Sequence, residues 1–131
     1  MQENYYKKFI SFLKEHNLYD ENAMEYLHQK GIFFDYAEEE DRDFIGCYFA
    51  INKKKRLESI ILCVPYIKDE KTLIINIHEY THALLYYKYL GKKVNIKNSS
   101  IEILPIMYEK LYVKENKSQL CKEYIEYLDS Q

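Results

Sequence analysis

Two histidines and a glutamate near the middle of the chain have residue types and a spacing that can bind a metal ion and move a proton. His78, Glu79 and His82 form an H-E-x-x-H motif. On an α-helix, side chains four residues apart project from the same face, so both imidazoles can bind one zinc ion while the glutamate lies beside them as a general base. The sequence therefore predicts His78 and His82 as metal ligands and Glu79 as a catalytic residue.

The segment that carries this motif is expected to be a long, firmly packed helix. Its apolar residues recur at helical spacing over residues 72–90, with Asp69 as the expected N-cap and Gly91 as the expected stop. A ligand pair needs such rigidity, because a displacement of about 1 Å spoils the coordination geometry. The side chains expected to bury this helix are Leu73, Ile74, Ile77, Leu84 and Leu85.

A third ligand is expected from the next helix, since a catalytic zinc takes three protein ligands and leaves the fourth position to water. Glu102 stands 20 residues after His82, and Glu109 follows seven residues later on the same helical face. We expect Glu102 to be the ligand. Glu109 would then accept a hydrogen bond from a histidine ring, or it is the ligand in place of Glu102.

The helix that carries both glutamates is predicted over residues 101–114. Ser99 and Ser100 can cap its beginning, and Pro105 is tolerated if it falls in the first turn. A last amphipathic helix, marked by apolar residues between positions 120 and 128, is expected to close the chain. These helices would place the acidic side chains next to the motif helix.

The first half of the chain supplies two helices and a β-hairpin. One helix is expected over residues 3–16, and a second begins after the N-cap Asp20 and ends before Gly31. The acidic run at residues 38–43 is typical of a solvated loop. Residues 44–52 and 57–65 read as two strands, and a turn near Lys55 would place Cys47 opposite Cys63. The fold class is therefore α+β, in a single domain over residues 1–131.

Composition excludes several classes of function. The 131 residues are 47% hydrophobic and 31% charged, with a net charge of −2, and the lysines form no basic stripe that nucleic acid would require. The first residues are acidic and polar where a signal peptide needs a basic start and an unbroken apolar run, so we expect no signal peptide. No apolar run reaches the ~18 residues of a membrane span. The three cysteines form no C-x-x-C pair, as expected of reduced thiols. We expect a cytoplasmic protein that binds neither nucleic acid nor a membrane.

The motif and the later glutamates resemble those of the gluzincin metallopeptidases, in which a glutamate ligand follows H-E-x-x-H on a second helix. Residues 101–109, IEILPIMYE, are also similar to the corresponding segment of thimet-type oligopeptidases, although the proline is displaced by one position and Ile106 replaces a serine. No third histidine follows as in metzincins. The resemblance covers residues 44–115, and the size of the chain is closest to the minigluzincins, which are minimal zincin-like domains.

This resemblance implies a zinc-dependent metallopeptidase that acts on a peptide or protein. One Zn²⁺ would activate a water molecule, and Glu79 would take the proton of that water and pass it to the departing amine. Tyr108 and Tyr112, near the glutamates, are expected as donors to the oxyanion. The terminal segment, residues 117–131, would keep the enzyme latent if it lies across the cleft.

Two other interpretations stay open. The chain can be a non-catalytic, zincin-like module that binds peptides or regulates a partner, or a helical interaction protein in which H-E-x-x-H arose by chance. Metal analysis separates the chance motif from the other two, and a substrate assay separates the peptidase from the module. His16 and His28 lie in ordinary helices and are expected to be structural.

Overall fold

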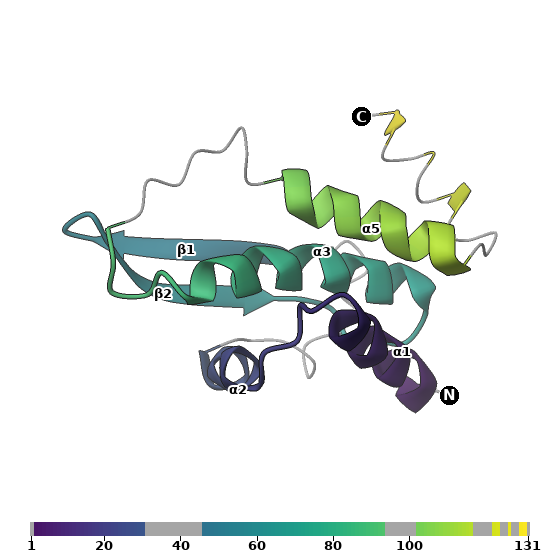
Figure 1. Cartoon of the computed structure of the whole chain (residues 1–131), viewed down its shortest axis with the longest axis horizontal. Coiled ribbons are helices and arrows are strands. Elements are labelled where there is room, and N and C mark those ends of the chain that lie inside the picture. The colour runs from purple at the N-terminus through teal and green to yellow at the C-terminus, as the bar shows by residue number, and fades with distance from the viewer. Residues whose placement is uncertain are drawn as a thin grey trace.

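The computed structural model of the chain describes residues 2–30, 46–93 and 102–116, together with positions 122, 123, 126, 129 and 130. Within these residues the fold is α+β, as the sequence predicts: two N-terminal helices, an antiparallel hairpin and two packed helices. In Figure 1, α5 lies along one side of α3, and α1 and α2 lie on the other. The elements are α1 (Gln2–Glu15), α2 (Glu21–Lys30), β1 (Cys47–Lys53), β2 (Arg56–Cys63), α3 (Glu70–Tyr87) and α5 (Ile103–Asn116).

The two N-terminal helices form where the sequence predicts them. In α1, Phe9 and Leu13 are fully buried, in agreement with the helical spacing of the apolar residues. Asp20 caps α2, because its Oδ1 accepts a hydrogen bond from the Ala23 amide at 3.0 Å. The expected stop of this helix at Gly31, and the acidic run at residues 38–43, lie outside the described residues.

The predicted hairpin is confirmed, with β1 antiparallel to β2 and Cys47 opposite Cys63. Lys54 and Lys55 form the turn, and both have positive φ values of 53° and 64°. Two consecutive positive φ values are typical of the two-residue turn that matches the right-handed twist of the strands. An irregularity between Ile51 and Asn52 shifts the register near this turn.

Helix α3 has the predicted N-cap, begins at Glu70, two residues before the predicted segment, and ends three residues earlier than predicted. Asp69 is its N-cap, and the side chain of Asp69 accepts a hydrogen bond from the Thr72 amide at 2.8 Å in a capping box. At the other end, the amides of Tyr89 and Leu90 bond to carbonyls three residues back, so the chain tightens into turns after Tyr87. Gly91 follows with a φ of 80°, and its amide bonds to Leu57 of β2.

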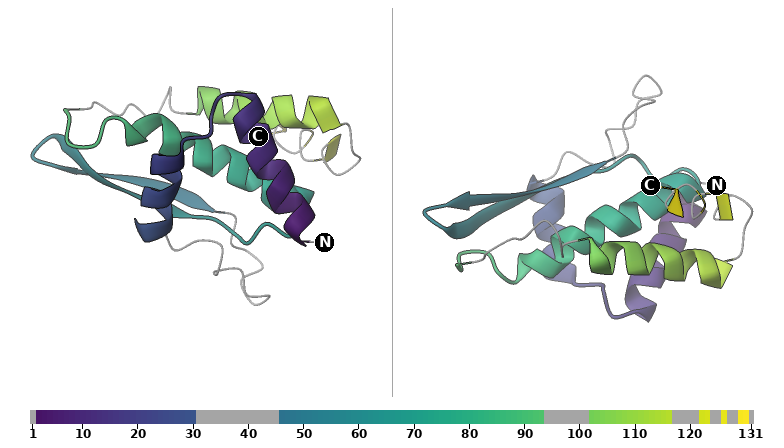
Figure 2. Two further views of the ribbon diagram at one scale, coloured as in Figure 1. Left: turned by 60° about the horizontal axis from the view of Figure 1, so that its bottom comes forward. Right: turned by 90° about the horizontal axis from the view of Figure 1, so that it is seen from above.

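Helix α5 starts at Ile103, two residues later than predicted, and this places Pro105 in its first turn, where proline is tolerated. The expected caps Ser99 and Ser100 lie outside the described residues, as does most of the expected terminal helix. Viewed from above in Figure 2, α3 lies between the hairpin and α5. The first residues of α5 therefore come close to the middle of α3.

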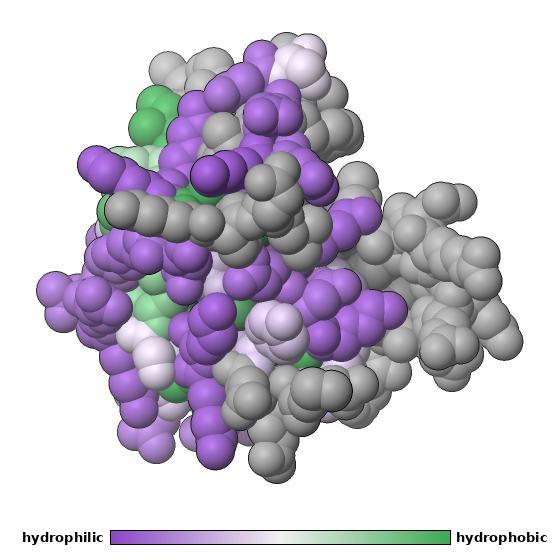
Figure 3. All heavy atoms as spheres, turned by 90° about the vertical axis from the view of Figure 1, so that its right-hand side faces the viewer, coloured by the Kyte–Doolittle hydropathy of each residue, from purple (hydrophilic) through white to green (hydrophobic). Residues whose placement is uncertain are grey.

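The core is built around α3, which contacts every other element named above. Leu84 and Leu85, which the sequence predicts to be buried, are only half-buried, because α3 approaches the surface in its last turn. The side of the molecule in Figure 3 is mostly hydrophilic, with small separate apolar areas. None of the described helices has both the length and the apolar character of a membrane span. Fully buried side chains of the core include Phe9, Leu13, Leu27, Leu57, Ile60, Leu62, Leu73, Ile74, Ile77, Tyr80 and Tyr112.

Candidate metal centre

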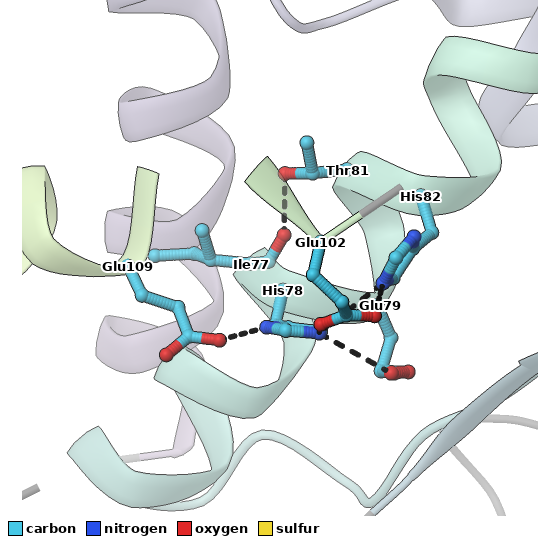
Figure 4. A network of polar contacts seen from close by, with 7 residues as sticks. All are labelled: Ile77, His78, Glu79, Thr81, His82, Glu102 and Glu109. Atoms are coloured by element: carbon cyan, nitrogen blue, oxygen red, sulfur yellow. Dashed lines mark hydrogen bonds and ion pairs between the residues drawn. The ribbon is translucent and has the colours of Figure 1, made fainter. Parts of the chain in front are cut away.

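His78 and His82 project from one face of α3, and their rings converge (Figure 4). Their Nε2 atoms lie 3.2 Å apart, and the two ring planes are inclined at 63°. His82 is 3% exposed. One residue before His82, the Thr81 hydroxyl donates a hydrogen bond to the Ile77 carbonyl at 2.6 Å, so this polar side chain is satisfied within the helix. The helix thus presents two imidazole nitrogens to one point in space.

Glu102, immediately before α5, directs its carboxylate at both nitrogens. Its Oε2 lies 2.9 Å from His78 Nε2, and its Oε1 lies 2.7 Å from His82 Nε2. In a tetrahedral zinc site, bonds of ~2.0–2.1 Å separate neighbouring ligand atoms by about 3.3 Å. The separations of 2.7 to 3.2 Å between these donors are therefore close to the spacing that such an ion requires.

Glu109 contacts the other side of the His78 ring. Its Oε1 accepts a hydrogen bond from Nδ1, and its side chain is only 1% exposed, whereas that of Glu102 is 47% exposed. A buried carboxylate on Nδ1 fixes the orientation of an imidazole and leaves Nε2 free to bind a metal. The two glutamates, which lie on one face of the sequence-predicted helix, thus contact opposite nitrogens of the same histidine.

Glu79 completes the group, with its Oε1 4.0 Å from His78 Nε2. Side-chain donor atoms of His78, Glu79 and His82 all lie within 4.8 Å of one another, so this cluster on α3 can hold a metal ion. The Oε2 atom of Glu79 is buried and has no hydrogen-bond partner in the part of the chain that the structure describes. A carboxylate oxygen in this situation is available to a proton or to a water molecule.

Gly46 allows the chain to pass close to Glu79 at the beginning of β1. Its φ is 107°, which side chains rarely adopt, and a Cβ atom there would lie 3.0 Å from Cγ2 of Ile75 and 3.3 Å from Cγ of Glu79. Gly46 was not among the residues predicted from the sequence. A glycine inside the predicted strand over residues 44–52 was the available signal.

Burial and mutual charge shift the ionisation of these side chains. Burial raises the pKa of Glu79 to about 7, the charges of Glu102 and Glu109 add to this effect, and His78 opposes it. Burial lowers the pKa of His82, which favours the neutral imidazole that binds metals. Burial has the same effect on His78, but the hydrogen bond and charge of Glu109, with the other carboxylates, outweigh it and raise the pKa. The site favours a positive charge, either a proton or a metal ion.

Tyr48 of β1 is a further neighbour of His82 that was not predicted from the sequence. Its ring is stacked on the imidazole of His82, with centroids 5.1 Å apart and planes inclined by 5°. Burial raises the pKa of the Tyr48 hydroxyl, and the nearby Tyr86 adds to this effect. The alternation of inward and outward side chains in the predicted strand was the available signal, but fifteen tyrosines in the chain gave it little weight.

The remaining predicted residues have contacts elsewhere. The rings of Tyr108 and Tyr112 on α5 lie 6.3 Å from the His16 ring and 5.6 Å from the Phe12 ring, so both have neighbours in the N-terminal region. Their role as oxyanion donors stays a prediction. His16 lies 3.1 Å from a carboxylate oxygen of Glu115, and the two form a separate surface group with Glu15.

His28 bonds through Nδ1 to the Met24 carbonyl at 2.7 Å, within α2. Neither His16 nor His28 is part of the cluster on α3. No family model, curated protein or solved structure matches the chain. Its function must therefore be inferred from the arrangement of its own residues.

Proposed function

We propose that the chain is a small zinc-dependent metallopeptidase of the gluzincin type, with His78, His82 and Glu102 as ligands and Glu79 as the general base. The observation that carries this proposal is the position of the Glu102 carboxylate, which bridges the two Nε2 atoms at 2.9 and 2.7 Å. A chance H-E-x-x-H would not require an acidic side chain from another element at this point. Glu102, immediately before α5, brings its carboxylate to this point.

The donor set supports zinc among the common metal ions. Two imidazole nitrogens and one carboxylate suit Zn²⁺, whereas Mg²⁺ and Ca²⁺ prefer sites made of oxygen ligands. Bound here, zinc would supply a Lewis acid and a water molecule of lowered pKa. Glu109 would keep the His78 ring in the orientation that directs Nε2 at the metal, through the hydrogen bond to Nδ1.

Glu79 is positioned to move a proton. As the water oxygen forms a bond to the carbonyl carbon of a peptide, Glu79 accepts the water proton, and it donates this proton to the nitrogen when the carbon–nitrogen bond breaks. Without a metal, burial raises the pKa of Glu79 to about 7. The positive charge of a bound zinc ion would lower this pKa and so favour the carboxylate, which is the form that accepts the water proton. The buried Oε2, without a partner among the described side chains, is the atom available for this proton.

Metal content and peptide hydrolysis together test the proposal. We expect about one zinc per chain by elemental analysis of the purified protein, loss of that zinc in His82→Ala, and retention in His28→Ala, because His28 bonds within its own helix. We expect Glu79→Gln to keep the zinc and to lower hydrolysis of a mixed peptide library by about 100-fold or more. A chain that contains no zinc would show that the motif arose by chance.

A zinc-loaded chain that cleaves no peptide would leave two alternatives, and removal of residues 116–131 separates them. If the terminal segment keeps the enzyme latent, its removal from the zinc-loaded protein should reveal hydrolysis. Continued absence of hydrolysis in a folded, zinc-loaded truncated chain would identify a non-catalytic module.

A further inference from the structure

The two histidines of the proposed centre are held in different ways. His78 is bonded through Nδ1 to the buried carboxylate of Glu109. The Nδ1 atom of His82 is also buried, yet it has no hydrogen-bond partner in the described part of the chain. In a ligand histidine, the N–H group of the second ring nitrogen usually donates a hydrogen bond to an acceptor, which fixes the ring orientation. Among the described residues, the orientation of His82 therefore depends on a contact of another kind.

The ring of Tyr48 makes that contact. It lies 5.1 Å from the His82 imidazole and almost parallel to it, with a 5° angle between the planes. Rotation of the imidazole about its bond to Cβ would turn its edge into the tyrosine ring. Tyr48 is held in turn by the hairpin, where it pairs with the fully buried Leu62, and by the ring of Tyr86 at 6.1 Å.

Stacking also suits the charge of a ligand histidine. An imidazole that donates its Nε2 electrons to a metal ion becomes partly positive, and the face of a tyrosine ring carries partial negative charge. The contact should therefore strengthen when the metal binds. The stacked ring leaves Nε2 free, since this atom points at Glu102 and His78 instead.

We propose that Tyr48 is a positioning residue for the metal centre, which orients His82 through its ring face as Glu109 orients His78 through its carboxylate. This inference rests on the proposed function, because it assumes that His82 binds the metal. It makes the β-hairpin a part of the metal centre, although no strand residue is a ligand. The aromatic ring of Tyr48, and not its hydroxyl, carries the effect.

Zinc affinity of three full-length variants tests the inference, measured by competition with a chromophoric chelator. We expect Tyr48→Leu to weaken zinc binding by about 10-fold or more, the lower range for the loss of a group that orients a ligand. We expect Tyr48→Phe, which keeps the ring, to bind within about threefold of the unaltered chain. Phe49→Leu is the matched control, because Phe49 is the next residue of β1 and is 54% exposed. Its affinity should not change.

Two readouts separate positioning from a general loss of structure. Thermal unfolding of the zinc-free variants reports whether Tyr48→Leu still folds. In the unaltered, zinc-loaded protein, nuclear Overhauser effects between the ring protons of Tyr48 and His82 report the stacking directly and need no variant. We expect clear cross-peaks, and we expect the ring protons of His82 to shift in Tyr48→Leu, where the tyrosine ring current is lost.

Several results would overturn the inference. A folded Tyr48→Leu chain with unchanged zinc affinity would remove Tyr48 from the centre, and absence of the cross-peaks would do the same if that variant does not fold. Equal losses in Tyr48→Phe and Tyr48→Leu would assign the effect to the hydroxyl. If the unaltered chain itself binds no zinc, the proposed centre fails and the inference fails with it. That outcome can be distinguished from failure of the inference alone, because neither the unaltered chain nor any of the variants would then bind zinc.

Discussion

Three carboxylates surround two imidazoles at the candidate centre, and this crowding has consequences for individual residues. Glu79, Glu102 and Glu109 all lie close to His78, and burial makes the negative charges of Glu79 and Glu109 costly. Without a metal, the positively charged form of His78 offsets part of this repulsion, which is why its pKa is raised despite burial. Each acidic side chain should therefore respond differently to replacement by its neutral amide.

Glu79→Gln should stabilise the zinc-free protein at high pH. The raised pKa of Glu79, about 7, means that the folded chain binds this proton more tightly than the unfolded chain. The contribution of the protonated Glu79 carboxyl group to the free energy of unfolding is then greatest at low pH and is lost as the pH rises to about 7. The glutamine variant avoids that loss, so we expect a gain of about 1–3 kcal/mol in the free energy of unfolding at pH 8.

Urea unfolding at pH 8 and pH 5 measures this effect. The advantage of Glu79→Gln should shrink at pH 5, where the carboxyl group of the unaltered chain is largely protonated. Glu58→Gln, at an exposed position of β2, is the control and should show no comparable dependence on pH. An equal gain at both pH values would contradict the assignment to ionisation.

Glu102→Gln and Glu109→Gln form a matched pair that identifies the third ligand. An amide is a poor zinc ligand, so Glu102→Gln should weaken zinc binding by about 100-fold or more. The amide oxygen of Glu109→Gln can still accept the hydrogen bond from His78 Nδ1, so the loss there should stay within about 10-fold. Chelator competition measures both affinities. The opposite order would make Glu109 the ligand.

At the scale of elements, the N-cap of α3 holds the beginning of the helix that carries the motif. Asp69 and Thr72 bond to each other's backbone in a capping box. We expect Asp69→Ala to lower the free energy of unfolding by about 1–2 kcal/mol, because the Thr72 amide and the Thr72 hydroxyl both lose Oδ1 of Asp69 as an acceptor. Asp69→Ser, which keeps a capping oxygen, should recover most of this loss. Chemical denaturation measures both, and a neutral Asp69→Ala would show that the cap contributes nothing.

The cysteine pair reports on the packing of the hairpin near Glu79. Burial raises the pKa of Cys47 to about 11, and the opposed Cys63 and the charge of Glu79 add to this effect. Only the thiolate reacts with iodoacetamide, so the alkylation rate of Cys47 should rise about tenfold per pH unit from pH 8 to pH 10. Peptide mass mapping follows the site. A rate that levels off near pH 9 would contradict the raised pKa.

The structure also shows which features the sequence can predict. Local signals were sufficient for the cap at Asp69 and for the opposition of Cys47 and Cys63, because both depend on residues near in sequence or on a short turn. The shared face of Glu102 and Glu109 followed from helical spacing. Which histidine nitrogen each glutamate contacts depends on how α5 packs against α3, and sequence spacing does not contain that information.

Two differences between sequence and structure have the same cause. Tyr48 was indistinguishable from the other tyrosines, because its importance comes from a tertiary contact between β1 and α3. The early end of α3 also depends on tertiary structure, since the chain turns to let Gly91 bond with β2. In both cases a contact between distant segments outweighs local preference.

For the whole molecule, metal binding should appear as stability. The proposed ligands come from α3 and from the residue before α5, so zinc would link two elements that the unfolded chain leaves apart. Free zinc at 100 times its Kd should add about 2.7 kcal/mol to the free energy of unfolding. Calorimetry should show a higher Tm that excess chelator reverses. His82→Ala should show no such rise, and an equal rise in that variant would place the bound zinc elsewhere.

The unequal exposure of the proposed ligands bears on how the protein would acquire its ion. The side chain of His82 is only 3% exposed, whereas that of Glu102 is 47% exposed. An ion held by these ligands would therefore face water on the side of Glu102, while His82 would contact it from inside the domain. Loading and stripping would then follow the surrounding zinc supply throughout the lifetime of the protein, and would not be confined to the moment of folding.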